Sequence, residues 1–529
     1  MALTRNKMAS QHSFAMVPRA EIPRSRYMLQ QARKQAFNTG TLIPIYCEEI
    51  LPGDHFKGNT TIFARAATPI TPVLDNAELE TFFFFVPNRL VWDNWEEFIG
   101  GGNFTIPVIH SAIGGFDVGS LYDHFGIPTG QQAGQDLTVN ALPLRAYNLI
   151  YNEWFRDQNL VTPRPIHTDD GPDPHTDYST SQRAKKHDYF TSCLPWPQKG
   201  TAVTVPLGTT APVVPSSSHI APTFWNQTAG TTAGQLIAPN AAVTPVGMST
   251  ITSPSSILGW DNPNLIADLS TATAATINSL RLAFQVQRML EKDARGGSRY
   301  TEQIQQHFGV RPPDYRLQRP EYIGGGRSMV NTHPIAQTSE TGSETPQGNL
   351  AAFTTIQGGG HRFQYAATEH GYIIGLVNVR TDLTYQQGLR RHWSRQTRYD
   401  YYWPTLAHLG EQAVLNQEIF ATGNSTNDTG VFGYQERWAE YRYTPNEITG
   451  LFRSQVPGSI DIWHYGQEFI GLPVLNSGFI LDPSYETFGR SLAVGNDANG
   501  QQILMDVLHR VQATRPMPTY SVPGLIDHF

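Results

Sequence analysis

Four consecutive phenylalanines, Phe82 to Phe85, constrain the fold of this chain more than any other feature. Successive side chains of a β-strand point to opposite faces, so Phe82 and Phe84 share one face while Phe83 and Phe85 share the other. Neither pair is compatible with a face that lies in water. The segment therefore predicts a strand that is covered on both faces, by other layers of the chain or by a second subunit.

A short helix is predicted directly after this strand, over Leu90–Ile99. Val91, Trp95 and Phe98 recur at helical spacing, and the glycines at 100–102 end the pattern. We expect a sandwich core to cover one phenylalanine pair. We expect this helix, another insertion or a neighbouring subunit to cover the other, so that all four rings are largely buried.

The composition favours an all-β protein with long loops. The chain of 529 residues contains 46 glycines and 37 prolines, which separate many short apolar runs. Its net charge of -7 argues against a chain that is basic throughout. Its two cysteines, Cys47 and Cys193, are too few for a disulfide scaffold. Since no run approaches the roughly 18 apolar residues of a membrane span, we expect a soluble protein of a reducing compartment.

Residues 1–35 are predicted to form a basic arm. It contains one acidic residue, Glu21, and seven cations: Arg5, Lys7, Arg19, Arg24, Arg26, Arg33 and Lys34. Two interpretations remain open, namely a mobile arm that contacts nucleic-acid phosphates and a solvated tail that lies over a subunit interface. If all seven cations met phosphates of a single strand, the logarithm of the affinity would fall with the logarithm of salt at a slope of about -5.

Residues between Lys199 and Asp261 contain no charged side chain. Apolar residues are spread through this stretch, and it includes the aromatic pair Phe224 and Trp225. A flexible linker usually carries charged residues or consists mainly of glycine and serine. We therefore predict that this stretch forms a small β-rich excursion, whose lack of charge suits close subunit packing. Amphipathic helices are predicted on either side of it, over Leu144–Asn159 and Thr276–Arg295.

Known catalytic patterns are absent from the sequence. Residues 169–173, Asp-Asp-Gly-Pro-Asp, offer oxygens for calcium, but a solvated acidic turn is favoured because calcium needs six or more ligands. Cys193 and His187 would lie about 20 Å apart on a strand, too far for a thiol dyad. Glu369 and His370 point to opposite strand faces, which favours a structural histidine. We therefore predict no enzyme, no catalytic residue, no cofactor and no metal ligand.

An arginine-rich segment follows Arg380 and is interleaved with Trp393 and several tyrosines. Arginine with aromatic residues is typical of single-strand binding by phosphate contact and base stacking. Arginine that stacks on its own aromatic neighbours and bridges subunits is the favoured interpretation. The candidate interface residues are Phe82, Phe83, Phe84, Phe85, Arg391, Trp393, Arg395 and Arg398.

An ordered set of motifs resembles one family, the major capsid proteins of microviruses, and within it the gokushovirus branch of small single-stranded DNA bacteriophages. The motifs include Ile22-Pro23-Arg24-Ser25, Leu51-Pro52-Gly53-Asp54, the segment 81–99, Leu194-Pro195-Trp196-Pro197, Leu383-Thr384-Tyr385-Gln386-Gln387-Gly388 and Pro523-Gly524-Leu525-Ile526-Asp527-His528. They run in the same order from near one end of the chain to the other. Each motif alone is weak, and the ordered set is highly specific.

The resemblance implies an eight-stranded antiparallel jelly roll, a β-sandwich with helical insertions and long loops, over residues 36–529. It implies sixty copies in a T=1 icosahedral shell around circular single-stranded DNA, assembled in the host bacterial cytoplasm. The implied partners are the chain itself at fivefold, threefold and twofold contacts, the DNA genome, a small basic DNA-binding protein, scaffolding and minor capsid proteins, and a host receptor. No membrane insertion is expected.

The chargeless stretch falls where such capsid proteins carry a variable insertion, taken here as residues 201–270. In relatives this insertion forms protrusions at the threefold axes that are proposed to meet the host. Phe224 and Trp225 are therefore host-attachment candidates, although burial among three copies is the favoured interpretation because exposed aromatic pairs are uncommon. The alternative function, a carbohydrate-binding or glycan-cleaving β-sandwich, needs paired carboxylates about 5–9 Å apart, and no Asp/Glu constellation supports it.

Overall fold

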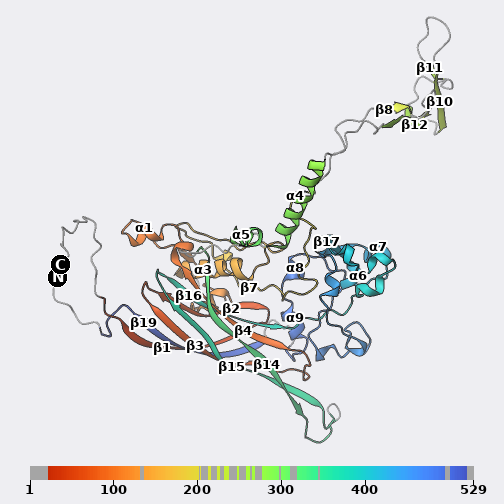
Figure 1. The fold of residues 1–529 in the computed structure, drawn as a ribbon. Helices are drawn as coiled ribbons and strands as arrows, with labels where there is room; N and C mark the ends of the chain where they lie inside the picture. Colours follow the sequence, from red (N-terminus) through yellow and green to blue (C-terminus); the bar gives the residue numbers. More distant parts are fainter. Residues whose placement is uncertain are drawn as a thin grey trace, which may run out of the picture. The chain divides into compact units, whose positions relative to one another are not determined.

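A large, curled antiparallel β-sheet dominates the protein (Figure 1). The computed structural model describes residues 22–112, 114–130, 136–201, 203, 213–215, 223–226, 231–237, 247–248, 258–262, 265–267, 277–296, 300–309, 318–342, 346–494 and 501–520. The sheet has nine strands, in the order β1 (Ser25–Phe37), β19 (Ile503–Arg515), β3 (His55–Ala66), β15 (Leu350–Ala366), β14 (Glu321–Ala336), β4 (Ala77–Pro87), β16 (Gly371–Thr381), β2 (Thr41–Ile50) and β7 (Ser181–Gln182).

The first strand pairs with the last one along its whole length. The register runs from Ser25 opposite Arg515 to Phe37 opposite Ile503. Residues 25–35, the second part of the predicted arm, therefore lie in the main sheet in this structure. Strand pairing holds this segment through backbone hydrogen bonds to a segment almost 500 residues away.

The core lies inside the curl, where the two halves of the sheet face each other. Tyr46 of β2 and Phe83 of β4 meet the ring of Phe363 on β15, with centroid separations of 5.7 and 4.4 Å. Phe83 and Phe85 are fully buried in this core. Apolar residues from β2, β4 and β16 thus pack against residues from β3, β15 and β19, as the layers of a β-sandwich do.

A second apolar cluster covers the outer face of β4, where Phe84 is only 1% exposed and Phe82 is half-buried. The cover consists of α3 (Leu142–Ile150) and the π-helical turn η2 (Tyr151–Phe155) that continues it, together with a ring of β14. Phe155 lies 5.1 Å from Phe82 and 5.8 Å from Phe84, measured between ring centroids. The helix predicted over 144–159 corresponds to these two elements.

The structure selects among the covers expected for the outer face of β4, and it corrects the interface assignment of the phenylalanines. The helix after the strand is only α1 (Trp95–Ile99), preceded by the 3-10 turn η1 (Asn88–Leu90), and the rings that contact Phe82 and Phe84 come from η2 and β14. The interface assignment is wrong for Phe83, Phe84 and Phe85, because these side chains are at most 1% exposed within a single chain.

Residues Gln198–Val310 form a second compact unit. The predicted insertion, residues 201–270, lies within it. Its strands are β8 (Val213–Pro215), β9 (Thr223–Asn226), β10 (Thr231–Ile237), β11 (Gly247–Met248), β12 (Leu258–Asn262) and β13 (Leu265–Ala267), and its helices are α4 (Ile277–Arg295) and α5 (Tyr300–Phe308). The helix predicted over 276–295 corresponds to α4. Phe224 and Trp225 lie in β9, and their side chains are outside the described residues.

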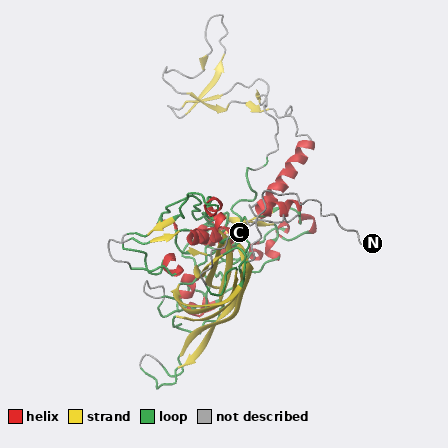
Figure 2. Cartoon of the chain, turned by 90° about the vertical axis from the view of Figure 1, so that its left-hand side faces the viewer, coloured by secondary structure: helices red, strands yellow, loops and turns green. Residues whose placement is uncertain are grey.

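Loops and short elements make up the rest of the first unit (Figure 2). Two small ribbons pair β5 (Val108–His110) with β6 (Thr138–Asn140) and β17 (Glu411–Leu415) with β18 (Val431–Glu436). The remaining helices are α2 (Leu121–Phe125), α6 (Asn416–Ile419), α7 (Ser425–Asp428), α8 (Ser477–Ile480) and α9 (Ser484–Gly489). Within the described residues, no helix combines the length and apolar character needed to cross a membrane.

Candidate assembly surface

Arginine and aromatic side chains gather on one surface of the first unit, between residues 390 and 443. Trp393 is 71% exposed and Tyr399 is 56% exposed, although both are large aromatic residues. We call this the arginine–aromatic surface, and its members are Arg391, Trp393, Arg395, Arg398, Tyr399, Tyr401, Tyr402, Trp403, Tyr441 and Tyr443. Exposed aromatic rings that gather in one region favour packing against a partner.

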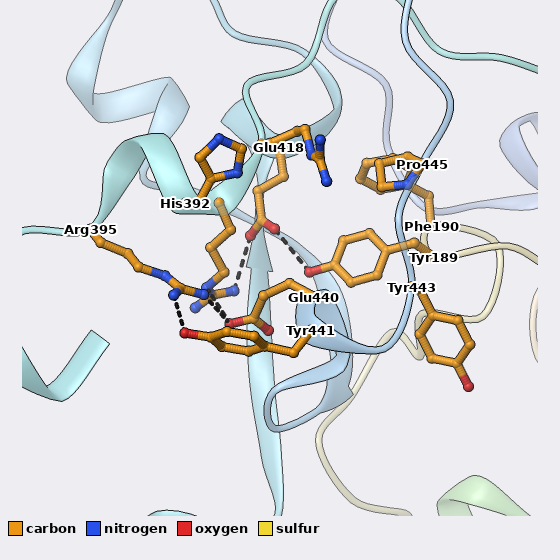
Figure 3. Close-up of a pocket in the computed structure, with 11 residues that line it drawn as sticks. Tyr189, Phe190, His392, Arg395, Glu418, Glu440, Tyr441, Tyr443 and Pro445 are labelled. Atoms are coloured by element: carbon orange, nitrogen blue, oxygen red, sulfur yellow. Dashed lines mark hydrogen bonds and ion pairs between the residues drawn. The ribbon is translucent and has the colours of Figure 1, made fainter. Parts of the chain in front are cut away.

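Two largely buried carboxylates hold two of the three arginines of this surface in place (Figure 3). Arg391 pairs with Glu418 at 3.0 Å, and Arg395 pairs with Glu440 at 3.2 Å. Burial raises the pKa of Glu418, while the Arg391 guanidinium opposes that rise. Glu418 also accepts a hydrogen bond from the Tyr189 hydroxyl at 2.9 Å. Arg391 and Arg395 are therefore fixed by the chain's own acidic groups.

The same arginines also stack on the tyrosines around them. The guanidinium of Arg395 lies 4.4 Å from the ring centroid of Tyr441 and donates a hydrogen bond to its hydroxyl. Arg398 lies 4.7 Å from the ring centroid of Tyr399. These contacts show the stacking of the favoured interpretation, and its second part, in which the arginines bridge subunits, stays a prediction. Trp403 and Tyr443 remain half-exposed beside them.

A small pocket of about 190 Å³ opens on this surface (Figure 3). It is lined by Tyr189, Phe190, Arg390, Arg391, His392, Arg395, Glu418, Glu440, Tyr441, Tyr443 and Pro445. Sequence reasoning found the arginines but missed Glu418, Glu440 and Tyr441. No local signal points to these partners, because they follow the arginines by about 20 to 50 residues and reach them only through the fold.

The cations of the predicted arm have different surroundings. Arg5, Lys7 and Arg19 lie outside the described residues, and Arg24 and Arg26 are exposed. Lys34 pairs with Asp506 at 2.8 Å on the outer face of β1. Arg33 points the other way and donates to the backbone carbonyls of His124 and Phe125, at 2.9 and 3.1 Å. A DNA contact by Arg33 is therefore inconsistent with this structure, because its donors are used at the end of α2.

The acidic turn at residues 169–173 is not simply solvated. Asp173 is buried, and its carboxylate receives two hydrogen bonds from the buried Arg145, at 2.7 and 2.5 Å. His167, Asp169 and Asp173 bring three ligand atoms within 4.8 Å of one another. The Arg145 guanidinium, which also contacts Asp169 at 3.3 Å, already supplies the positive charge there. The turn thus anchors α3 over the sheet.

The two other residue pairs considered for chemistry have structural surroundings. Cys193 is 3% exposed, and burial raises the pKa of its thiol, which disfavours the reactive thiolate. Glu369 forms an ion pair with Arg89, with hydrogen bonds of 2.7 and 3.0 Å. Neither site brings together an activated nucleophile and a base.

Comparison with known proteins identifies the family. The family model described as "Capsid protein (F protein)" matches residues 15–525. Capsid protein VP1 of Bdellovibrio phage phiMH2K is 47% identical, over 98% of this chain and 99% of that protein. Capsid protein VP1 of Spiroplasma virus 4 is 40% identical and that of Chlamydia phage 1 is 39% identical, each over 97% of both chains.

These matches extend over almost the whole chain, so they include the curled sheet, the arginine–aromatic surface and the second unit together. The relatives are structural proteins of virus particles, and the exposed rings of this chain suit a protein that packs against copies of itself. The chain therefore belongs to the capsid (F) protein family of microviruses and is a structural major capsid protein of the virion.

Proposed function

We propose that sixty copies of this chain assemble a T=1 icosahedral shell around circular single-stranded DNA, in the cytoplasm of a bacterial host. The arginine–aromatic surface carries the proposal, because it leaves large rings in water in the single chain, next to two arginines that Glu418 and Glu440 hold in ion pairs. An obligate interface needs such pre-ordered apolar area. The subunit is structural in this proposal and performs no catalysis.

The sheet is proposed to be a jelly roll of eight strands, with β7 as a short addition. If the eight long strands are numbered in chain order, their order in the sheet is first, eighth, third, sixth, fifth, fourth, seventh, second. This order corresponds to two four-stranded sheets that are joined where β14 pairs with β15. The shared core inside the curl supports the same interpretation.

The second unit is proposed to form the threefold protrusion for host attachment, through the insertion at 201–270. Its composition supports this role, since residues 200–260 contain no Lys, Arg, Asp or Glu and a stretch of this kind packs closely against copies of itself. Phe224 and Trp225 remain its candidate contacts. A small basic DNA-binding protein, scaffolding and minor capsid proteins and a host receptor are the proposed partners.

The test is assembly of a variant that loses ring area but keeps the ion pairs. Trp393→Ala is expected to lower the yield of uniform shells at least tenfold by negative-stain microscopy and size-exclusion chromatography, with an unchanged melting temperature of the unassembled chain. Tyr520→Ala is the matched control, because Tyr520 is 80% exposed outside the surface. Equal shell yields for both variants would contradict the assignment, and a monomer that binds glycan would favour the alternative function.

A further inference from the structure

The outer face of the four strands β1, β19, β3 and β15 is not covered by other described parts of the chain. In β3 the exposed and buried residues alternate along the strand, so His55, Lys57, Asn59, Thr61, Phe63 and Arg65 point outward. The matching positions of β19 are Leu504, Asp506, Leu508, Arg510, Gln512 and Thr514. This face is solvated, in contrast to the outer face of β4.

The charges on this face are mostly positive. Six cations from four strands lie on it, and they are Arg26, Lys34, Lys57, Arg65, Arg362 and Arg510. Asp506 is the only carboxylate among these outward positions. The whole chain has 38 cationic and 45 acidic residues, so this excess is local. We call it the basic sheet face.

Four of these cations are available to a partner. Within the described residues, Lys57, Arg65, Arg362 and Arg510 form no ion pair. The register places Arg510 and Arg362 on either side of Asn59, and Lys57 lies two residues along the strand from Asn59. Neighbouring strands are about 4.8 Å apart and alternate residues about 7 Å apart, so these charges form a close grid.

Two exposed aromatic rings lie beside the cations. Phe63 is 42% exposed with Arg65 over its ring, at 5.5 Å from the centroid. Phe353 is 46% exposed and stacks on His333 at 4.9 Å. A shallow groove of about 530 Å³ lies next to Phe63 and Arg65. Cations for phosphates together with rings for bases are the combination that single-stranded nucleic acid recognises.

We infer that the basic sheet face binds single-stranded nucleic acid, with Lys57, Arg362 and Arg510 on phosphates and Phe63 stacking on a base. This inference rests on the proposed function, since it implies that the face lines the inside of the shell. It assigns the DNA contact to a folded sheet in addition to any contact by the arm, of which Arg26 and Lys34 belong to this face. Asn59, Gln357 and Gln364 offer amide groups to base edges on the same face.

The test measures binding by the unassembled full-length chain, with a fluorescent twenty-nucleotide thymidine probe. The triple variant Lys57→Gln, Arg362→Gln, Arg510→Gln is expected to bind roughly tenfold or more weakly at 50 mM salt. The slope of its affinity with salt should be smaller by about 2, from about 0.7 for each lost contact. Arg281→Gln, Arg288→Gln, Lys292→Gln removes the same charge from exposed positions of α4 and should change the affinity less than about twofold.

Equal losses in the two triple variants would overturn the inference, since binding would then depend on net charge alone. Phe63→Ala tests the stacking contact. It should weaken binding of the thymidine probe roughly tenfold and leave binding of a polyphosphate probe unchanged. If polyglutamate binds as tightly as the oligonucleotide and Phe63→Ala has no effect, the face fits an acidic protein and the inference is wrong.

Assays of shell formation test the proposed function, and oligonucleotide binding tests this inference, so the two can fail independently. Shells of normal size with unaltered oligonucleotide affinity in the first triple variant would overturn the inference and leave the capsid function intact. Failure of the native chain to form shells under any condition would contradict the proposed function. The oligonucleotide measurements would still decide the binding site, because they are made on the unassembled chain.

Discussion

The two halves of the curled sheet solve the same packing problem in different ways. In β4 every residue but one is buried, because the core covers one face and α3 with η2 covers the other. In β3 buried and exposed residues alternate, because only the inner face is covered. We call β14, β4, β16 and β2 the β4 half, and β1, β19, β3 and β15 the β3 half. The β4 half therefore derives stability from burial of residues on both faces of its strand β4. The β3 half keeps one face free for an interaction.

The largest expected difference between the halves concerns their phenylalanines. Phe83→Ala removes a fully buried ring from the core and should lower the free energy of unfolding by about 3 to 5 kcal/mol. The measurement is urea unfolding of the unassembled chain. A loss under 1 kcal/mol would mean that the core inside the curl is not closely packed.

The buried ion pair in the cover of the β4 half gives a second large effect. Asp173→Asn leaves the buried Arg145 without its buried charged partner, with only the exposed Asp169 beside it, and should lower the free energy of unfolding by about 3 to 5 kcal/mol. Asp169→Asn is the matched control, because this carboxylate contacts the same guanidinium but is 75% exposed. It should cost less than about 1 kcal/mol. Equal losses of unfolding free energy in the two variants would show that the burial of Asp173 adds nothing to the ion pair.

Acid should lower the free energy of unfolding by protonating His509, whose ring joins the two halves of the sheet. This buried ring contacts the Ile45 carbonyl of β2 from β19, across the core, at 3.1 Å. Burial lowers its pKa from 6.5 to about 4. Because the unfolded chain takes up the proton first, the stability from neutral His509 is complete above about pH 6.5. It is lost progressively as the pH falls to about 4, by about 3 kcal/mol in total.

The measurement is urea unfolding at pH 7 and pH 4.5. His509→Gln should reduce the difference in unfolding free energy between these pH values, since it removes the titrating group. His55→Gln is the control, because His55 lies on the solvated outer face of β3. A pH dependence that is unchanged in His509→Gln would contradict the role of this ring.

The smallest expected effect is on the open face. Phe63→Ala should change the free energy of unfolding by no more than about 1 kcal/mol, because the ring is 42% exposed and has solvent on one side. Comparison with Phe83→Ala in the same urea titration sharpens the contrast between the halves. A cost as large as that of Phe83→Ala would mean that the outer face of β3 is covered after all.

Much of this contrast is predictable from local sequence. Four phenylalanines in a row allow no solvated face, and burial of Phe83, Phe84 and Phe85 confirms the prediction of a strand covered on both faces. The ordered motifs predicted a capsid protein, and the family match confirms that prediction. These features depend on side-chain alternation and on short motifs, which are properties of neighbouring residues.

Only the tertiary structure decided which elements meet. The cover of Phe84 comes from η2, about 70 residues later, and the partner of β1 is the last strand of the sheet. The partners of Arg391 and Arg395 are likewise distant in sequence. The basic sheet face collects its charges from four strands that span residues 26 to 510. Strand register and long-range pairing set these contacts, and no local pattern contains them because each depends on where another segment lies.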